Sequence, residues 1–433
     1  MTHIVKQKEL LDQFKDGDSE YALIQNPAGV FPEVEIAPLS RKISATNDLR
    51  AVVCDMDGTL TTTEGLCLHS LETMVKRWMI PEHAQRWSGL DPERDYPHVI
   101  GNSTTRHVEY LMETYGDQLD PQQFTAAFIH AARWLLVQGK DLRLKADVRR
   151  QIQIAGGNAT AFEEGESQST DLTIPDGLQQ VSFAVTIYYQ RYHEILQAMG
   201  SPDLKEVAPG LDALIEPMPG VGLFLTLIKG WLTPEQMLDL YPTWMEALPA
   251  DLMPRRGDPE YELGQKRLSG LAEYFQAKPA IVGLVTSSID YEMRIVLKAV
   301  FSEISQQIQD WNIDQAHKNE LLAKFSDYRQ VLDVRVNASA SSEGRLKPHR
   351  DLYSMALQQL GVPTSEFECV IGFEDSESGV IAMRAAGIGL AMAVPFLETS
   401  KHDLSAATAI LKGGLAEAVV MQGLFLNLKD ETH

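Results

Sequence analysis

Three features are scarce in this sequence of 433 residues: cysteine, positive charge and long apolar runs. The 3 cysteines, Cys54, Cys67 and Cys369, are odd in number and form no CxxC pair, which argues against a disulfide framework and a structural zinc site. No apolar run approaches the roughly 20 residues of a membrane-spanning helix, and the first residues lack the apolar stretch of a secretory signal. We therefore expect a cytoplasmic protein with reduced thiols and no membrane partner.

Basic residues are fewer than acidic ones: the sequence has 38 lysines and arginines and 60 aspartates and glutamates, which gives a formal net charge of -22. Such a surface repels phosphate backbones and anionic lipid, so nucleic acid is not an expected partner. A small anionic substrate is still compatible with this charge, since a local positive pocket can overcome the overall field. The length suits two or three structural units rather than one core.

Short apolar runs bounded by Gly, Asp, Ser or Pro predict the strands of a sheet. These runs cover Ala51–Cys54, Ala280–Val285, Val331–Val336, Cys369–Ile371 and Ile388–Val394. Most are followed by a helical pattern, and continuous apolar strands that alternate with helices predict a parallel sheet covered on both faces. A last helix over 405–421 is expected to close this sheet.

Between residues 66 and 276 the apolar period is helical almost throughout, as in the stripe of Leu71, Met74, Val75 and Trp78. Asp120 before Pro121 is typical of a helix N-terminus within this region. The sequence thus predicts an α/β core interrupted by a large, mainly helical insertion. The expected units are an N-terminal extension (1–45) with a short strand near Val34 and Ile36, the core (46–65 and 277–425), the insertion (66–276) and a C-terminal tail (426–433).

Two carboxylates follow the first strand, in the segment Asp55-Met56-Asp57-Gly58-Thr59. Asp55 and Asp57 can face one ligand if the chain turns there, as Gly58 permits. Ligands of parallel sheets bind beyond the carboxyl ends of the strands, which is where these residues are placed. Taken alone, the segment fits a turn with a capping aspartate equally well.

Two further segments carry groups suited to phosphate. Thr286, Ser287 and Ser288 end the strand Ala280–Val285 and offer hydroxyls and backbone N–H groups before a helix, although Ser and Thr are also routine helix caps. Lys347 precedes another helix and could neutralise a phosphoryl group as a point charge, although most lysines are simply solvated.

The fourth segment is acidic, since Glu374 and Asp375 follow the strand Cys369–Ile371. Adjacent acids repel each other unless they share a cation, and hard oxygen ligands suit Mg²⁺. The alternative reading is that they complement the N-terminus of a helix over 377–386.

Together and in this order, the four segments resemble the motifs of the haloacid dehalogenase (HAD) superfamily, in its phosphatase and beta-phosphoglucomutase-like branch. The matching segments are CDMDGTL (54–60), LVTSS (284–288), LKPHRDLY (346–353) and VIGFEDSESGVIAMRAAG (370–387). The resemblance implies a Rossmann-like core with a cap domain between the first two motifs. It covers the core well, the cap poorly and the N-terminal extension not at all.

The resemblance also implies roles for single residues. Asp55 would be the nucleophile and Asp57 the general acid and base, with Thr286 and Lys347 on the phosphoryl oxygens. Mg²⁺ would be held by Asp55, the backbone carbonyl of Asp57, and Asp375, with Glu374 assisting. The remaining residues expected beside the substrate are Gly58, Thr59 and Ser287.

Within the insertion, the segment 100–106 resembles the loop by which such caps reach the active site, so Arg106 could bind a substrate anion. A helix N-terminus capped by Ser103 or Thr104, with Arg106 solvated, is the alternative. The segment 217–221 resembles the return from cap to core. The aromatic cluster of Tyr188, Tyr189, Tyr192 and His193 is more typical of the packed interior of the insertion than of a substrate platform.

The leading interpretation is a Mg²⁺-dependent phosphatase that hydrolyses a small phosphorylated metabolite through an aspartyl-phosphate, which divides the reaction into two easier steps. Thr59 matches the phosphatase form of the first motif. A sugar phosphomutase of the beta-phosphoglucomutase type is the alternative, since it shares every core residue named here. A non-catalytic binding protein is a third hypothesis, against which the intact Asp55, Asp57, Lys347 and Asp375 argue.

Overall fold

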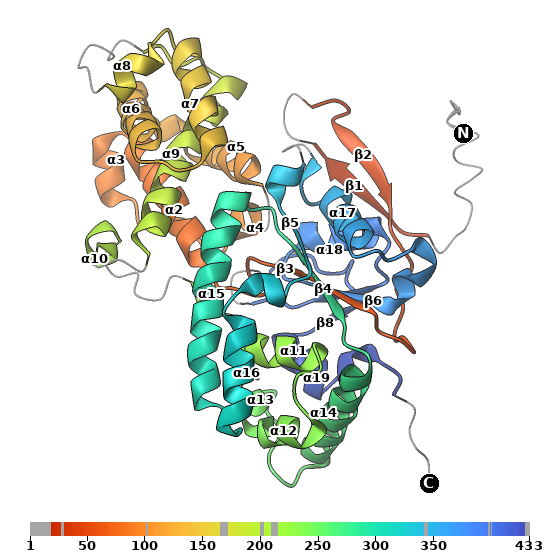
Figure 1. Ribbon diagram of the computed structural model, residues 1–433. Coiled ribbons are helices and arrows are strands. Elements are labelled where there is room, and N and C mark those ends of the chain that lie inside the picture. The colour runs from red at the N-terminus through yellow and green to blue at the C-terminus, as the bar shows by residue number, and fades with distance from the viewer. Residues whose placement is uncertain are drawn as a thin grey trace, which may run out of the picture.

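The structure is a computed structural model that describes residues 19–26, 30–100, 103–164, 172–199, 203–208, 215–341, 345–396, 399 and 401–428 (Figure 1). Parts of the expected N-terminal extension (1–18 and 27–29) and of the expected C-terminal tail (429–433) lie outside the described residues.

A six-stranded parallel sheet forms the centre of the protein, with the strand order β5-β4-β3-β6-β7-β8. The strands are β3 (Ala51–Asp55), β4 (Ile281–Val285), β5 (Val334–Val336), β6 (Val370–Glu374), β7 (Leu390–Ala393) and β8 (Ala409–Ile410). The predicted α/β class with a parallel sheet is therefore confirmed. From β3 the chain builds the sheet outward first on one side and then on the other, so β3 stands at the topological switch point, where open α/β sheets bind ligands.

Each expected core strand is present, although β5 is shorter than predicted. The helix expected over 405–421 is wrong in its first half. Residues Ala409–Ile410 instead form the edge strand β8, and the backbone N–H groups of Thr408 and Leu411 donate to carbonyls of β7. The adjacent glycines at 413 and 414 interrupt a helix at this point, and α19 (Gly414–Val420) begins only there.

Helices cover both faces of the sheet. On one face, Ala51 and Val53 belong to a buried cluster with side chains of α17 (Asp351–Gln359) and α18 (Glu377–Ala386). The alternate residues Val52 and Cys54 belong to the cluster on the other face, which includes α11 (Val221–Ile228), α15 (Asp290–Asp310) and α19. This alternation follows from the period of two along a strand. Asp55, at the end of the strand, lies on the same face of the sheet as Ala51 and Val53.

The expected insertion comprises two groups of helices. The first group, here called the cap, contains α2 (Glu64–Trp78), α3 (Pro81–Arg86), α4 (Tyr96–Val99), α5 (Thr104–Tyr115), α6 (Pro121–Val137), α7 (Leu142–Ile154), α8 (Ala159–Glu163), α9 (Leu178–Ala198) and α10 (Leu204–Val207). Its interior includes the predicted apolar stripe of α2, whose four side chains are completely buried. Asp120 caps α6 by accepting hydrogen bonds from two backbone N–H groups, as predicted.

The second group packs against the core rather than forming part of the cap (Figure 1). It consists of α11, α12 (Pro234–Asp239), α13 (Tyr241–Glu246) and α14 (Pro259–Ala277), which pack on one another and on α15 and α19. Helix α16 (Gln315–Phe325) packs beside α15. Short 3-10 turns complete the fold: η1 (Gly116–Gln118), η2 (Tyr328–Gln330), η3 (Ala338–Ala340), η5 (Thr364–Cys369) and η6 (Gly423–Phe425).

The two chain segments that join the cap to the core lie side by side. The backbone N–H of Thr62 donates to the carbonyl of Glu216 at 3.0 Å, and that of Met218 donates to the carbonyl of Leu60 at 3.0 Å. Thr61 and Pro217 form an isolated antiparallel bridge between them. This paired connection is here called the hinge.

The described part of the N-terminal extension forms an antiparallel hairpin of β1 (Tyr21–Gln25) and β2 (Val34–Pro38). The strand expected near Val34 and Ile36 is confirmed, whereas β1 was not predicted. Two arginines fix the hairpin to the core: Arg345 donates to Glu35, and the buried Arg384 donates to the carbonyl of Ser40 and to Glu20.

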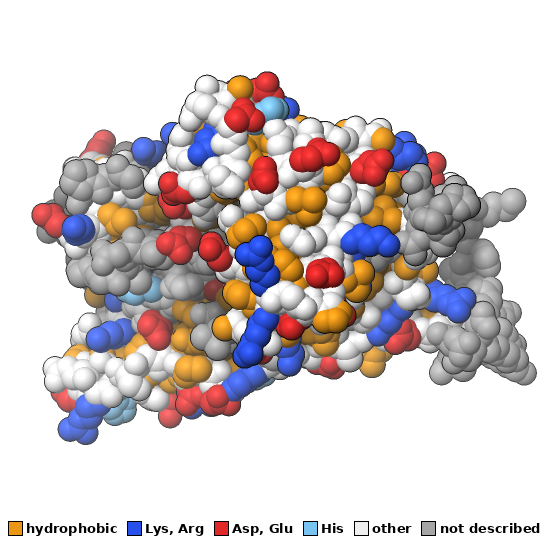
Figure 2. All heavy atoms as spheres, turned by 90° about the horizontal axis from the view of Figure 1, so that it is seen from below, with side chains coloured by type: hydrophobic (Ala, Val, Ile, Leu, Met, Phe, Trp, Pro, Cys, Tyr) orange, Lys and Arg blue, Asp and Glu red, His pale blue; other side chains and the backbone are white. Residues whose placement is uncertain are grey.

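The surface carries both signs of charge despite the acidic excess. On the face seen from below, Figure 2 shows acidic and basic side chains among hydrophobic ones. No helix in the described part of the chain is long and apolar enough to cross a membrane.

Candidate active site

Asp55 ends the central strand β3 and is 4% exposed. Cys54 pairs with Phe373 of β6, which places Asp55 level with Glu374 across the sheet. Gly58 follows with φ +80°, and a Cβ there would lie 2.5 Å from Oδ2 of Asp375. Glycine is therefore required at this turn for two reasons, its backbone conformation and the close approach of a carboxylate.

Lys347 connects the ends of β3 and β6. Its Nζ donates hydrogen bonds to Oδ1 of Asp55 and to Oε1 of Glu374, and the side chain is buried. Burial alone would lower the pKa of Lys347, but the adjacent charges of Asp55 and Glu374 raise it overall. The ammonium group therefore stays charged.

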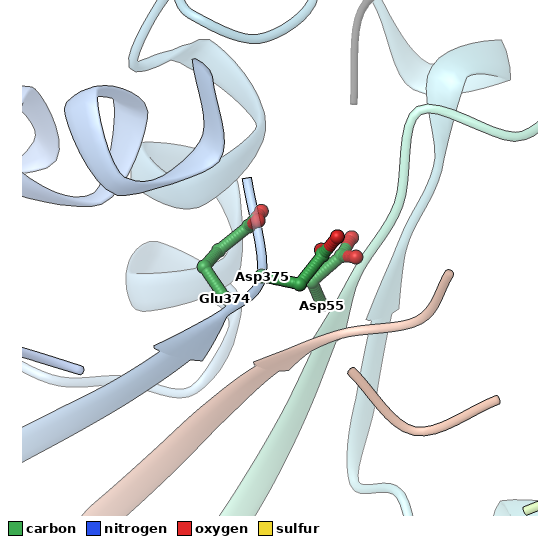
Figure 3. Close-up of side chains that lie close together, drawn as sticks. All are labelled: Asp55, Glu374 and Asp375. Carbon is green, nitrogen blue, oxygen red and sulfur yellow. The ribbon is translucent and has the colours of Figure 1, made fainter. Parts of the chain in front are cut away.

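Three carboxyl groups meet at the strand ends, from Asp55, Glu374 and Asp375 (Figure 3). One oxygen of each lies within 4.8 Å of the others. Burial and the charge of Glu374 raise the pKa of both Asp55 and Asp375 well above the usual range. Oδ2 of Asp375 is buried without a hydrogen-bond partner. Buried, mutually repelling carboxylates with an unsatisfied oxygen fit a divalent cation, and an all-oxygen donor set suits Mg²⁺.

The two adjacent acids differ in their surroundings. Oε1 of Glu374 accepts from Lys347 and, at 2.9 Å, from the hydroxyl of Tyr353, while Oε2 accepts from the Ser376 hydroxyl at 3.0 Å. A Cβ at Gly379 would lie 1.9 Å from the carboxyl group of Glu374, so this glycine lets α18 approach. Glu374 thus orients Lys347, whereas Asp375 presents the unsatisfied oxygen.

Asp57 accepts three hydroxyl hydrogen bonds. Thr286 and Ser288 each donate to Oδ2 at 2.9 Å, and Thr63 donates to Oδ1. The backbone N–H of Ser288 in turn donates to the Thr286 hydroxyl at 2.9 Å. The resemblance implied that Thr286 holds a phosphoryl oxygen, and the structure places its hydroxyl on Asp57.

A partly open pocket lies above Asp55 between the core and the cap. The core residues on its wall are Asp55, Asp57, Thr63, Ser287, Ser288, Glu292, Lys347, Asp375 and Ser376. The cap supplies Glu64, Cys67, Val99, Ile100, Thr104, His107, Tyr188, Tyr189 and Tyr192. The remaining predicted core residues, Gly58, Thr59, Thr286 and Glu374, are buried behind this wall.

The structure corrects the interpretation of the aromatic cluster on α9. Tyr188 and Tyr192 are each 4% exposed, which agrees with a packed interior, but they line the pocket together with Tyr189. Each ring thus packs in the cap on one side and reaches the pocket on the other. The spacing of these residues in the sequence predicts that they share one face of a helix. It does not predict whether that face is turned toward the core.

Arg106 lies in a different groove from the pocket. This groove is formed by residues of β1, by Pro348 and by side chains of α18. From the same helix, Thr104 and His107 do line the pocket. Gly101 and Asn102, from the loop expected to reach the active site, lie outside the described residues.

Several residues of the site were not singled out from the sequence. Thr63 holds Asp57, Ser376 holds Glu374, and Glu292 reaches the pocket from α15. The hydroxyl run 61–63, shortly after Asp57, was a signal for Thr63. Ser288, which the sequence marked as suited to phosphate, donates to Asp57 instead. Nothing in the sequence links Glu292 to His193 of the cap, whose ring nitrogen lies 3.0 Å from it.

No protein-family model matches the sequence, and no curated protein does. Among solved structures, the chain is similar to CbbY from Rhodobacter sphaeroides in complex with phosphate (16% identity, TM-score 0.40), covering 87% of this chain and 100% of that one. It is also similar to a HAD family hydrolase from Deinococcus radiodurans R1 with bound phosphate and sodium (14%, 0.40), covering 88% and 99%. A third similar structure is the beta-phosphoglucomutase of Clostridium difficile (13%, 0.36), covering 84% and 90%. These similarities are distant in sequence.

Proposed function

We propose that this chain is a HAD-type phosphatase that hydrolyses a small phosphate monoester with Mg²⁺, through a phosphoryl group carried on Asp55. The observation that supports it best is the arrangement around Asp55. A buried carboxylate at the topological switch point lies against a charged lysine and beside an unsatisfied Asp375. A binding protein would have no use for a buried carboxylate that is held facing the pocket in this way.

Asp55 acts first in the proposed reaction. Its free oxygen attacks phosphorus, so that an O–P bond to Asp55 forms as the bond from phosphorus to the leaving oxygen breaks. Lys347 favours the ionised form of Asp55, against burial and the charge of Glu374, and offsets the repulsion between two anions. Both reacting groups lie under the cap, which limits the access of bulk water.

Asp57 moves the protons. In its protonated form it gives a proton to the leaving oxygen, and as a carboxylate it then takes one from the water that attacks the aspartyl-phosphate. Thr63, Thr286 and Ser288 hold this side chain on the pocket wall by their hydroxyl groups. Their hydroxyls can also rotate to accept a hydrogen bond, so the same residues suit both protonation states.

The residues present fit Mg²⁺, which would be held by Asp55, Asp375 and the backbone carbonyl of Asp57. When bound, the ion supplies positive charge that neutralises the phosphoryl oxygens. Ser287, which lines the pocket beside Ser288, is placed to donate hydrogen bonds to the same phosphoryl group.

The test is the release of inorganic phosphate from p-nitrophenyl phosphate, with Mg²⁺ and with a chelator in its place. We expect steady turnover that needs the metal and is absent in Asp55→Asn. Phosphate should appear without any bisphosphate activator. Conversion of one sugar phosphate into its isomer, faster than phosphate release, would instead identify a mutase.

A further inference from the structure

A second pocket lies beside the one above Asp55, also between the cap and the core. The two pockets share three wall residues, Thr104 and Tyr189 from the cap and Ser287 from the core. The hydroxyl of Tyr189 donates to Oγ1 of Thr104 at 3.3 Å, so this hydrogen bond and Ser287 form the border between the pockets. The second pocket is here called the side chamber. The rest of its wall comes from α5, α7 and α9 of the cap and from core residues beside α15 and η3.

The position of the side chamber relative to the catalytic residues suits a leaving group. None of Asp55, Lys347 and Asp375 lines it, whereas Ser287, which we propose donates to the phosphoryl group, lines both pockets. In phosphoryl transfer the leaving oxygen departs on the side of phosphorus opposite to the nucleophile. An alcohol attached to a phosphoryl group beside Ser287 can therefore continue into the side chamber.

The polar groups on the wall of the side chamber are largely hydrogen-bonded within the protein. Gln151 is 8% exposed; its Nε2 donates to the carbonyl of Ser182 at 2.9 Å, and its Oε1 accepts from the hydroxyl of Thr186 at 2.7 Å. Oδ1 of Asp141 accepts from the backbone N–H of Leu144 at 2.6 Å. These contacts leave little hydrogen-bonding capacity for a ligand.

The charged side chains on this wall balance one another. Among the described residues that line the side chamber, Arg143 and Arg150 are matched by Asp141 and Asp147. Arg150 and Asp147 form an exposed ion pair at 3.0 Å. Because the formal charges cancel, the side chamber has no reason to select an anionic or a cationic alcohol.

The side chamber therefore offers a ligand mainly apolar surface. Its apolar side chains come from both units and are Leu144, Ile154, Val185, Ile289, Ala338 and Leu346. Ile154 is 48% exposed, whereas Leu346 is 6% exposed, so this surface runs from the interior to the outside of the protein. Apolar groups gain free energy when such a surface removes them from water.

We propose that the leaving group of the substrate is an elongated apolar alcohol that passes Ser287 into the side chamber, so that the substrate class is a phosphate monoester of a medium-length alkyl alcohol. This inference rests on the proposed phosphatase function. The alkyl chain lies between Val185 and Leu144 of the cap and Ile289 of the core. The residues shared by the two pockets are what assign the side chamber to the substrate rather than to a separate ligand.

The alkyl chain takes no part in the bond changes. The O–P bond to Asp55 forms, the bond between phosphorus and the alcohol oxygen breaks, and Asp57 gives its proton to that oxygen. Water then attacks phosphorus, returns a proton to Asp57 and releases inorganic phosphate from Asp55. The side chamber thus selects the substrate without altering the chemistry.

The test is a series of unbranched esters, ethyl, butyl, hexyl and octyl phosphate, which differ only in the number of methylene groups. Complete burial of one methylene corresponds to about a four-fold gain, so kcat/KM should rise along the series until the side chamber is filled. From ethyl to hexyl phosphate we expect a rise of about 10-fold or more. A smaller rise would overturn the inference.

Variants locate the alkyl chain. Val185→Thr and Leu144→Gln place a polar group on the wall of the side chamber, and each should lower the ratio of kcat/KM between hexyl and ethyl phosphate by several fold. Because both substrates meet the same variant, a general loss of folding or rate cancels from this ratio. Val181→Thr makes the same change one turn earlier on α9, at a residue that lines neither pocket, and should leave the ratio unchanged.

Val99→Thr changes the wall of the pocket above Asp55 instead. A ratio that falls in Val99→Thr but not in Val185→Thr and Leu144→Gln would place the alkyl chain in that pocket and overturn the inference. A ratio that moves in none of the three variants would contradict the side chamber equally.

Two further measurements separate the inference from the function on which it rests. Turnover of p-nitrophenyl phosphate that depends on Asp55, without a gain along the alkyl series, would leave the phosphatase standing and remove the apolar leaving group. Absence of turnover for every ester would remove both. Calorimetric titration of Asp55→Asn with ethyl and with hexyl phosphate, in Mg²⁺, needs no catalysis, and equal affinities would also overturn the inference.

Discussion

The Nζ of Lys347 donates a hydrogen bond to Oδ1 of Asp55 across 292 positions of sequence, at the carboxyl edge of the sheet. The contact exists because β3 and β6 are neighbours while Lys347 precedes α17 on the face where Asp55 points. The bond engages Oδ1 of Asp55, so Oδ2 is the oxygen that we propose attacks phosphorus.

Asp55→Asn should remove turnover for every substrate, because an amide is a poor nucleophile and no longer pairs with the lysine. Asp57→Asn should keep the first step for p-nitrophenyl phosphate, whose leaving group needs little protonation, and lose about 10²–10⁴-fold in the second. Rapid mixing should show a burst of p-nitrophenol near one equivalent, with the trapped phosphoryl group on Asp55 by mass spectrometry. Activity retained in Asp55→Asn would exclude the covalent mechanism.

Asp375→Asn should lose the stabilisation that Mg²⁺ gives the wild-type protein. A ligand that binds only the folded state stabilises it by RT ln(1 + [L]/Kd), so the melting temperature of the wild type should rise with Mg²⁺ concentration. The variant should show little rise over the same range. A shift as large as in the wild type would show that Asp375 does not hold the metal.

Gly379→Ala should damage the site without breaking α18. The new methyl group would be placed 1.9 Å from the carboxyl group of Glu374, which must then move and carry Lys347 with it. We expect a large fall in kcat with a folded protein by circular dichroism. Gly65→Ala is the matched control, since a Cβ there meets nothing within 4 Å. Full activity in Gly379→Ala would show that Glu374 does not position the lysine.

Arg106→Ala tests a residue that the sequence marked as a substrate ligand. Because its side chain lies in the groove beside β1 and α18, kcat/KM should stay within about two-fold of the wild type for all substrates, a change of less than half a kcal/mol. A selective rise in KM for an anionic ester would indicate that Arg106 reaches the pocket when the cap takes another position.

Asp95 should control the acid stability of the cap. Burial alone would raise its pKa, but hydrogen bonds from Arg94, Tyr115 and Tyr110 lower it to about 2. A folded-state pKa below the unfolded value gives stability that is present above pH 4 and is lost as the pH falls toward 2. Asp95→Asn should lower the free energy of unfolding by about 2 kcal/mol at pH 7. The stability of the variant should also fall less steeply than that of the wild type as the pH decreases from 4 to 2. Parallel pH profiles for the two proteins would contradict this assignment.

The sheet and the catalytic motifs were predictable because each is encoded locally. Buried parallel strands read as continuous apolar runs, and polar residues at their ends must meet at one edge. Asp55 and Asp375 could therefore be placed at one edge from the strands that they follow, whereas Lys347, which precedes a helix, joined them only through the resemblance of the four motifs. The edge strand β8 escaped prediction because its two residues sit in an alanine-rich stretch that also fits a helix.

The cap side of the site could not be predicted to the same degree. Tyr188 and Tyr192 are correctly spaced for one face of a helix, but their direction depends on how the cap packs on the core. The contact of His193 with Glu292 joins two units and has no local signature. Even the partner of Thr286 depends on the turn at Gly58, which directs Asp57 toward it.

The hinge has a consequence for the engineering of the chain. Thr61 and Pro217 are bridge partners, so the points where the cap leaves and rejoins the core lie about 5 Å apart. Residues between them, apart from Thr63, which holds Asp57, can be exchanged for another cap without stretching the strand that carries Asp55. Such a chimera would keep the nucleophile, the lysine and the acidic pair, and would receive its substrate preference from the transplanted segment. Exchange of the cap would thus change about half of the pocket wall and leave the residues at the strand ends in place.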